Sequence, residues 1–220
     1  MKLPFTLEQF LAVFKDYNES IFPLQIFFNV LAIVAIYFAI KKNAYSAGII
    51  SLILSFLWLW MGIGYHLVFF STINKAALLF GLLFIIQGIL FLYHGSLKNK
   101  FHFDFRLSIY SIVGSALIIY SLIGYPILSY YYGHRYPSSP TFGLPCPTTI
   151  FTFGLLLINS KNVSFRILII PVLWSIVGSS AAINLGFIED TGLIIAAILT
   201  VSFLIIRHRS LKTYSEVAKY

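Results

Sequence analysis

Cysteine and charged residues are both scarce in this sequence. Cys146 is the only cysteine, so no intramolecular disulfide can form, and a cysteine-pair redox site or a cysteine-rich zinc site is excluded. Charged residues occupy 10% of the 220 positions, whereas an ordinary soluble domain carries roughly 25%. A soluble fold of this size cannot bury the apolar surface that replaces them, which excludes the ordinary soluble classes.

Long apolar runs take the place of the missing charge. Hydrophobic residues make up 59% of the chain, and the mean hydropathy is +0.90. The charges are grouped, which leaves runs near the roughly 20 residues that a helix needs to cross a bilayer. We predict an all-α, polytopic membrane bundle of about seven transmembrane helices, over residues 22–40, 45–65, 76–94, 107–130, 147–159, 166–185 and 191–207.

Basic residues gather in alternate connections between the predicted helices. The larger set has eleven members and the smaller set four: Lys41, Lys42, Lys98, Lys100, Arg106, Lys161, Arg166, Arg207, Arg209, Lys212 and Lys219, against Lys2, Lys15, Lys75 and Arg135. Because cytoplasmic loops are enriched in Lys and Arg, the N-terminus is predicted outside and the C-terminus in the cytoplasm. We expect contact with the lipid bilayer, attraction to anionic lipid on the cytoplasmic face, and no binding of nucleic acid.

The whole chain is predicted to form a single integral membrane domain over residues 1–220, with an outer interfacial helix (1–20), an ordered outer loop (131–146) and a basic cytoplasmic tail (208–220). In the interfacial helix, Thr6 and Gln9 have the spacing of a capping box. In the outer loop, prolines restrict the unfolded chain and aromatic residues can anchor it at the membrane interface.

Several polar residues fall in the outer half of the predicted bundle. Gln25 and Asn29 are four residues apart and share a helix face, so they are candidate ligand-binding residues. His66 lies at the outer end of a stripe of small residues, which predicts that it faces the bundle, and Tyr65 beside it is a further candidate. The alternative for these side chains is hydrogen bonding between helices.

Acidic residues give no sign of an active site in this pattern. Glu189 and Asp190 lie in the predicted outer turn between the last two helices, and we expect them to be solvated caps. The sequence contains no HExxH motif and no P-loop, and we expect no paired inward carboxylates.

The stretch "GLPCPTTIFTFG", residues 143–154, contains the single cysteine between two prolines. Proline lacks a backbone donor and disfavours helix for the residue before it, so the fifth helix is predicted to begin near Pro147 or Thr148. Cys146 then lies near a helix N-terminus, where the dipole favours a thiolate. A short, proline-interrupted span is typical of binding sites in membrane proteins, and the hydroxyls of Thr148, Thr149 and Thr152 are candidate ligand groups.

Three residues on the outer side form a candidate metal site. A thiolate from Cys146 with imidazoles from His66 and His134 would suit a soft transition-metal ion. An anionic ligand on the threonine turn fits the helix dipole better. The plainer alternative is that Cys146 is a small buried hydrophobe at a tight turn.

Three longer stretches, "LPFTLEQFLAVF", "WMGIGYHLVFFSTINKAALLFG" and "YPSSPTFGLPCPTTIFTFG", resemble an uncharacterised family of bacterial multi-pass membrane proteins that is catalogued only as a domain of unknown function. The resemblance implies a location in the bacterial inner membrane and no particular activity. The Pro-Cys-Pro stretch alone resembles nickel/cobalt exporters and heavy-metal pumps, although the chain lacks the pumps' second cysteine and the exporters' His-rich loop.

Three classes of function remain open. The first is a small transporter or a metal- or ligand-binding protein with a site in an outer vestibule near Cys146 and His66. The second is a seven-helix sensor or structural membrane protein without transport. The third is a membrane thiol enzyme in which His66 or His134 acts as base to Cys146; because no third group orients the base, an enzyme is the less favoured class.

Overall fold

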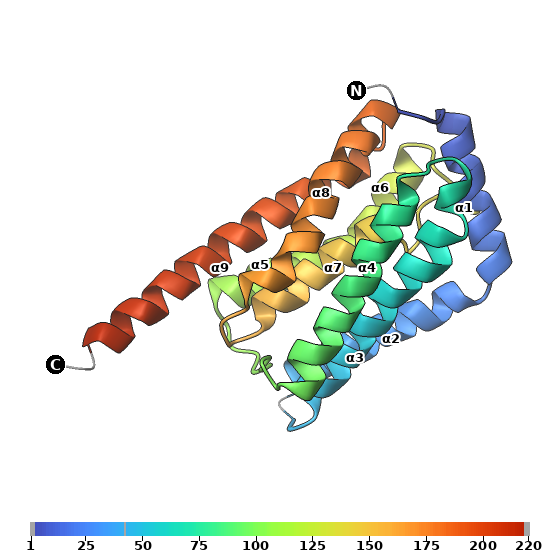
Figure 1. The fold of residues 1–220 in the computed structure, drawn as a ribbon. Helices are drawn as coiled ribbons and strands as arrows, with labels where there is room; N and C mark the ends of the chain where they lie inside the picture. Colours follow the sequence, from blue (N-terminus) through green and yellow to red (C-terminus); the bar gives the residue numbers. More distant parts are fainter. Residues whose placement is uncertain (1–2, 42, 218–220) are drawn as a thin grey trace.

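The computed structural model describes residues 3–41 and 43–217 (Figure 1). All regular secondary structure in these residues is helical, apart from two isolated β-bridges. The prediction of an all-α fold is therefore confirmed. The predicted topological roles of Lys2, Lys42 and Lys219, and the last residues of the predicted 208–220 tail, lie outside the described residues.

The longer helices are α1 (Leu7–Ile21), α2 (Leu24–Ile40), α3 (Ser46–Trp60), α4 (Ala77–Phe91), α5 (Ile109–Ile119), α6 (Tyr125–Tyr131), α7 (Pro145–Ile158), α8 (Phe165–Leu185) and α9 (Thr191–Val217). The shorter elements are the π-helical segments η1 (Met61–Leu67), η3 (Leu92–Leu97) and η4 (Tyr120–Gly124), and the 3-10 turns η2 (Phe70–Thr72) and η5 (Ile188–Asp190).

Within the described residues, five continuous helical runs are long and apolar enough to cross a membrane: Ser46–Thr72, Ala77–Leu97, Ile109–Tyr131, Phe165–Leu185 and Ile188–Ser210. The count rises to six if α1 and α2, which are bent by 83° relative to each other, form one broken span. The remaining predicted segment is α7, which is apolar but has only 14 residues. At 1.5 Å per residue it spans about 21 Å of a bilayer core that is roughly 30 Å thick.

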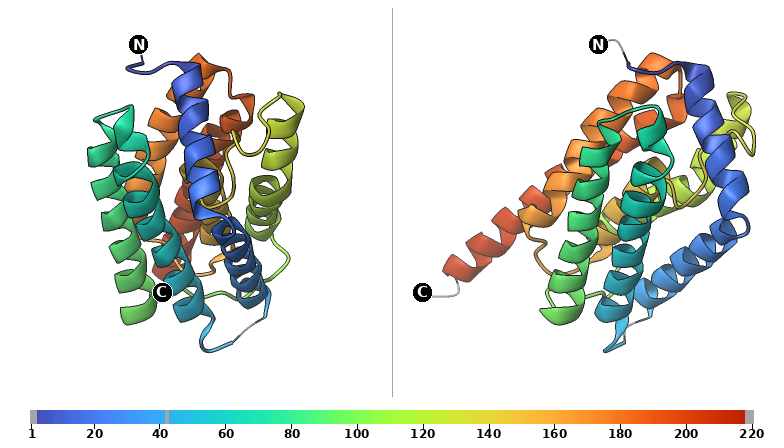
Figure 2. Two further views of the ribbon diagram at one scale, coloured as in Figure 1. Left: turned by 90° about the vertical axis from the view of Figure 1, so that its right-hand side faces the viewer. Right: turned by 45° about the vertical axis from the view of Figure 1, so that its right-hand side comes forward.

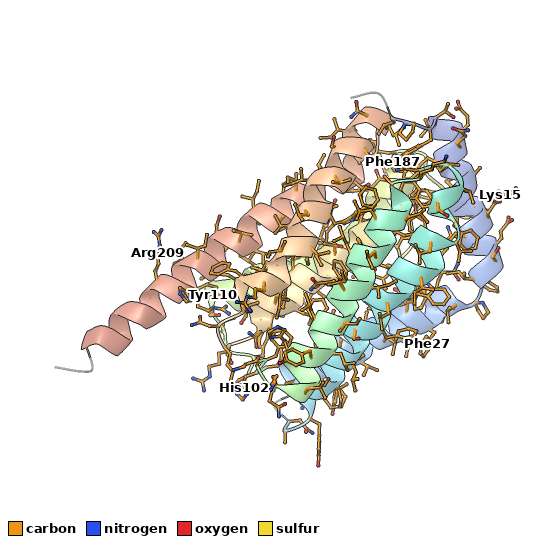
Figure 3. The ribbon with its side chains drawn as sticks, in the orientation of Figure 1. Lys15, Phe27, His102, Tyr110, Phe187 and Arg209 are labelled. Atoms are coloured by element: carbon orange, nitrogen blue, oxygen red, sulfur yellow. The ribbon has the colours of Figure 1, made fainter. Side chains whose placement is uncertain are left out.

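The connections between helices gather at two opposite ends of the bundle. Lys15 and Phe187 lie at one end and His102 and Arg209 toward the other (Figure 3). We call these the η5 end, which contains α1, η5 and residues 132–144, and the Asn159 end, which contains residues 98–108 and 159–164. α9 runs obliquely from η5 across the bundle, and its C-terminal part projects to the side beyond the other helices (Figure 2). The connections rich in Lys and Arg thus lie at one end of the bundle, and the connections poor in Lys and Arg lie at the other.

α1 lies against the η5 end of the bundle. The predicted capping box is confirmed, because Thr6 Oγ1 accepts from the Gln9 amide at 3.3 Å and Gln9 Oε1 accepts from the Thr6 amide at 2.9 Å. Tyr17 is fully buried, and its hydroxyl accepts a hydrogen bond from the Trp60 indole at 2.8 Å. The inner face of α1 is therefore part of the packed molecule.

α7 is enclosed by the other helices. Every residue of α7 except Cys146 is buried, and the helix contacts α2, α5, α8 and α9. Its closest crossing is with α5, where a Cβ added to Gly154 would lie 2.6 Å from the carbonyl oxygen of Gly114. Only glycine permits this approach, since any side chain would force the two backbones apart.

The start of α7 differs from the prediction, and its end is bound by an arginine. It begins at Pro145, two residues before the predicted start, because proline is favourable in the first turn, where backbone amides lack helical partners. At its other end the Arg207 guanidinium donates to the carbonyls of Leu157, at 2.8 Å, and Asn159. The same guanidinium lies 4.1 Å from the centre of the Tyr110 ring.

Candidate functional site

The turn between α8 and α9 carries the acidic pair Glu189 and Asp190 and is buried. Gly186, in the left-handed conformation with φ 82°, ends α8 and turns the chain into η5. Glu189 is fully buried and Asp190 is 5% exposed. The expectation that these two residues are solvated caps is therefore wrong. The physical reason is tertiary: α6 packs against η5, and no local sequence pattern reports that contact.

The two carboxylates have different partners. The Tyr125 hydroxyl donates to Oδ1 of Asp190 at 2.5 Å, and the Tyr120 hydroxyl donates to the backbone carbonyl of Glu189 at 2.6 Å. Oε1 of Glu189 lies 2.8 Å from Nδ1 of His134. Within the described part of the chain, Glu189 thus has a histidine ring nitrogen as a close partner, whereas no Lys, Arg or His side chain lies within ion-pair distance of Asp190.

A cavity of about 480 Å³ lies beside Asp190. Aromatic rings from six helical elements line it, among them Phe14 of α1, Tyr65 of η1, Tyr125 of α6 and Trp174 of α8. This volume lies in the range of small-molecule sites, which are mostly apolar with a few convergent polar groups. The cavity is therefore the strongest candidate site at the η5 end.

Cys146 lines the same cavity from the first turn of α7. The side chains of Asp190 and Trp174 line the same cavity. Of the predicted site residues, Cys146 and Tyr65 are thus brought together at one cavity, and Asp190 and Trp174 join them.

His66 is fully buried, as its position on the small-residue stripe predicts. It lies in the π-helical segment η1, and its ring centroid is 4.6 Å from that of Phe84 and 5.0 Å from that of Trp174. Neither ring nitrogen has a hydrogen-bond partner. His66 is not among the residues that line the cavity; the ring of Trp174, which does line it, contacts His66.

The predicted metal ligands are engaged separately. His134 pairs with Glu189, His66 is packed among aromatic rings, and Cys146 lines the cavity. Among residues 3–41 and 43–217, no group of three or more His, Cys, Asp or Glu side chains has an arrangement that could hold a metal ion. A soft-metal site formed by these three residues stays a prediction that no described contact favours.

Gln25 and Asn29 line a second cavity of about 460 Å³, together with His134. The side-chain amide of Gln25 donates to the backbone carbonyl of Asn18 at 2.7 Å. The side-chain amide of Asn29 donates to the backbone carbonyl of Gln25 at 2.8 Å. Tyr125, Pro140 and Pro147 line both the first, largely aromatic cavity and this more polar one.

The threonines of α7 have roles within the fold. The Thr148 hydroxyl oxygen accepts from the Gly143 amide at 3.1 Å. The Thr152 hydroxyl accepts from the Trp58 indole at 3.1 Å and donates to the Thr148 carbonyl at 2.8 Å. The Thr149 hydroxyl is buried without a partner. All three are fully buried, and none of them lines either cavity.

Asp190, Tyr125 and Trp174 are the site residues that sequence reasoning missed. Asp190 belongs to the only pair of adjacent acidic residues in the chain, which is a usable signal because intramembrane carboxylates are costly and commonly functional. Tyr125 and Trp174 carried no comparable signal, since aromatic residues are frequent throughout the sequence.

The fold and cavity place the chain in a broad class: an all-helical, apolar bundle with five or six helices that can span a membrane. A family model described as "family of unknown function (DUF6064)" matches residues 7–215. The chain belongs to that family. No curated protein and no solved structure matches it, so the likeness of the Pro-Cys-Pro stretch to metal exporters has no support beyond the motif itself.

Proposed function

We propose that this chain is an integral membrane protein that binds a small, largely apolar molecule in the cavity beside Asp190 and Cys146. The observation that carries the proposal is the cavity of about 480 Å³, with its aromatic wall and few polar groups. Aromatic walls supply apolar contact, and a single polar group sets the orientation of a ligand. A buried carboxylate in a membrane protein is a functional-site hypothesis in its own right.

The predicted site residues take separate roles in this proposal. Cys146 and Tyr65 contact the bound molecule directly. Gln25, Asn29 and His134 shape the neighbouring polar cavity. His66 and the α7 threonines Thr148, Thr149 and Thr152 keep the surrounding helices in place, a role that their complete burial supports.

The proposed arrangement in the membrane is seven crossings with the N-terminus outside and the C-terminus in the cytoplasm of a bacterial cell. It is supported by the eleven-to-four distribution of Lys and Arg and by the gathering of the two sets of connections at opposite ends (Figure 3). The η5 end, with the cavity, then faces outward. α7 makes the short crossing, surrounded by protein and so shielded from lipid.

The domain boundaries follow from the same arrangement. We propose an outer interfacial segment over residues 1–20, which includes most of α1, an ordered outer loop over residues 131–146 and a cytoplasmic tail over residues 208–220. The loop is supported by Asn18, whose side-chain amide donates to the carbonyls of Pro137 at 2.7 Å and Ser139 at 2.8 Å.

Transport of the bound molecule is a second candidate, favoured by the second cavity, which Tyr125 also lines. A transport path would also have to continue to the Asn159 end. The buried side chains of α7 occupy the middle of the bundle, and Arg207 binds the carbonyls at the end of that helix. This arrangement favours a binding or sensing role over transport.

The test uses Cys146 as a reporter, because it is the only thiol in the chain. The protein is placed in phosphatidylcholine vesicles and labelled with N-ethylmaleimide, with and without decan-1-amine, decan-1-ol or decanoate. We expect at least one of them to slow labelling of Cys146, because an occupied cavity excludes the reagent. The matched control is Ser160→Cys in a Cys146→Ser background, at an exposed position of the Asn159 end. If none of the three compounds slows labelling beyond the control, the proposal fails.

A further inference from the structure

We infer that the molecule bound in the cavity is an amphipathic amine, whose ammonium group pairs with Asp190 and whose apolar body lies against the aromatic wall. This inference rests on the proposed function and assigns the chemical class of the ligand. It is carried by three features of the site: the charge balance of the cavity lining, the state of the neighbouring carboxylate, and the identity of the aromatic rings.

The charge balance favours a cation. Asp190 is the only acidic residue that lines the cavity, and no Lys, Arg or His is among the described residues that line it. A carboxylate held away from water is costly unless a positive group or several hydrogen bonds compensate it. The Tyr125 hydroxyl supplies one hydrogen bond, to Oδ1. A ligand ammonium group would supply the missing positive charge.

The neighbouring carboxylate of Glu189 has a partner inside the protein on one of its two oxygens, Oε1, while Oε2 is buried without a hydrogen-bond partner. Glu189 lies 2.8 Å from a ring nitrogen of His134, and that ring stacks on Phe187 with centroids 4.0 Å apart. Glu189 is not among the residues that line the cavity. Of the two adjacent carboxylates, therefore, Glu189 is bound to His134 inside the protein and Asp190 lines the cavity. Only Asp190 is placed to meet a ligand.

The wall of the cavity suits the rest of such a ligand. Trp174, Tyr65 and Tyr125 present aromatic rings, and a cation within about 6 Å of a ring face is attracted to it, most strongly for tryptophan. Alkyl or aryl carbons would pack against the same rings. An anionic ligand would instead be repelled by Asp190, and a sugar-like ligand would leave most of its hydroxyls against apolar side chains.

The experiment compares three ligands that share a ten-carbon chain and differ in the head group: decan-1-amine, decan-1-ol and decanoate. Each is titrated against N-ethylmaleimide labelling of Cys146 in phosphatidylcholine vesicles, and its concentration is expressed as the mole fraction in the membrane. We expect decan-1-amine to protect Cys146 at about a tenfold lower mole fraction than decan-1-ol, the size of effect that one charge-assisted hydrogen bond gives, and decanoate to be the weakest.

Two variants assign the preference to one carboxylate. Asp190→Asn removes the charge but keeps an oxygen that can accept from Tyr125, and we expect the preference for the amine to be lost. Glu189→Gln removes the adjacent carboxylate outside the cavity lining, and we expect the preference to be kept. Protection by decan-1-ol needs the cavity but no charge, so its persistence in both variants shows that they are folded.

The outcomes separate this inference from the proposed function. Equal protection by the amine and the alcohol in the unmodified protein would overturn the amine assignment and leave the binding proposal intact. Equal loss of the preference in both variants would overturn the assignment to Asp190. Absence of protection by all three compounds would overturn the binding proposal itself.

Discussion

The two ends of α7 belong to one buried helix but are built in opposite ways. At the Asn159 end, Arg207 donates to the carbonyls of Leu157 and Asn159, and Asn159 Oδ1 accepts from the His102 amide at 2.6 Å. At the η5 end, the first turn borders the cavity through Cys146. The C-terminal end is closed by donors from two other segments, whereas the N-terminal end is left beside an open volume.

The difference follows from what each helix end needs. The last carbonyls of a helix require donors, and a buried helix without them is costly; Arg207 supplies charged ones. At the first turn the unpaired groups are amides, but Pro145 and Pro147 have none. The amide of Thr148 already donates to the carbonyl of Leu144 at 3.2 Å. Because the two prolines have no backbone N–H, the first turn can face an apolar cavity while leaving few amide groups without a hydrogen-bond acceptor.

The largest expected effect is on stability, from Arg207→Ala. This change leaves two carbonyls at the end of a buried helix without their charged donor and removes the contact with Tyr110. Because hydrogen bonds to charged groups contribute about 1.5–3 kcal/mol each, and Arg207 is partly exposed, we expect a loss of about 2–4 kcal/mol in the free energy of unfolding, measured by denaturant titration in detergent.

Arg207→Lys is the matched control for that variant. Lysine keeps the charge but has no planar fork to reach two carbonyls at once, so its loss should be intermediate. Below the unfolding transition, the labelling of Cys146 should be unchanged in both variants, since the cavity lies at the other end of α7. A stability equal to that of the unmodified protein in Arg207→Ala would refute the account of this end.

A smaller effect is expected at the η5 end, from Asn18→Ala. The Asn18 amide donates to the carbonyls of Pro137 and Ser139, and its oxygen accepts from the Thr141 hydroxyl at 2.8 Å. Loss of these bonds should cost about 1–3 kcal/mol and loosen residues 132–144. We expect faster cleavage of that segment by an added protease.

The control for the loop is Asn43→Ala at the opposite end of the bundle. Asn43 is exposed and its side chain accepts a local hydrogen bond from the Tyr45 amide at 2.9 Å, so cleavage of residues 132–144 should not change. Equal cleavage rates in Asn18→Ala and the unmodified protein would show that Asn18 does not hold the loop.

The helices of this protein are largely predictable from its sequence, because long apolar runs and capping signals are local. Each of the seven predicted segments coincides with a helix, and the Thr6–Gln9 capping box is present. Cys146 and Tyr65 were also identified as site residues, and both line the cavity. The signal for Cys146 is its position between Pro145 and Pro147, which predict the start of a helix.

The rest of the site depends on tertiary contacts that the sequence does not report. Glu189 and Asp190 look like a solvated turn until α6 packs against it and Tyr125 binds Asp190. His66 and Cys146 share a side of the bundle in the sequence pattern. In the structure His66 packs against Trp174 and Cys146 lines the cavity, and within the described residues neither belongs to a group that could hold a metal ion. The spacing of residues along the chain predicts which side chains share a helix face. It does not predict which side chain of another helix, such as Trp174, packs against that face.

The central claim is that the η5 end of α7 opens outward onto a binding cavity, while the Asn159 end is closed. The most direct measurement is labelling of Cys146 by a membrane-impermeant maleimide in right-side-out and inside-out bacterial membrane vesicles. It is compared with Leu157→Cys in a Cys146→Ser background, at a fully buried position of α7. The account predicts that Cys146 reacts in right-side-out vesicles, that decan-1-amine slows this reaction, and that the cysteine at position 157 reacts in neither orientation. Labelling of Cys146 only in inside-out vesicles, or equal labelling of both positions, would contradict it.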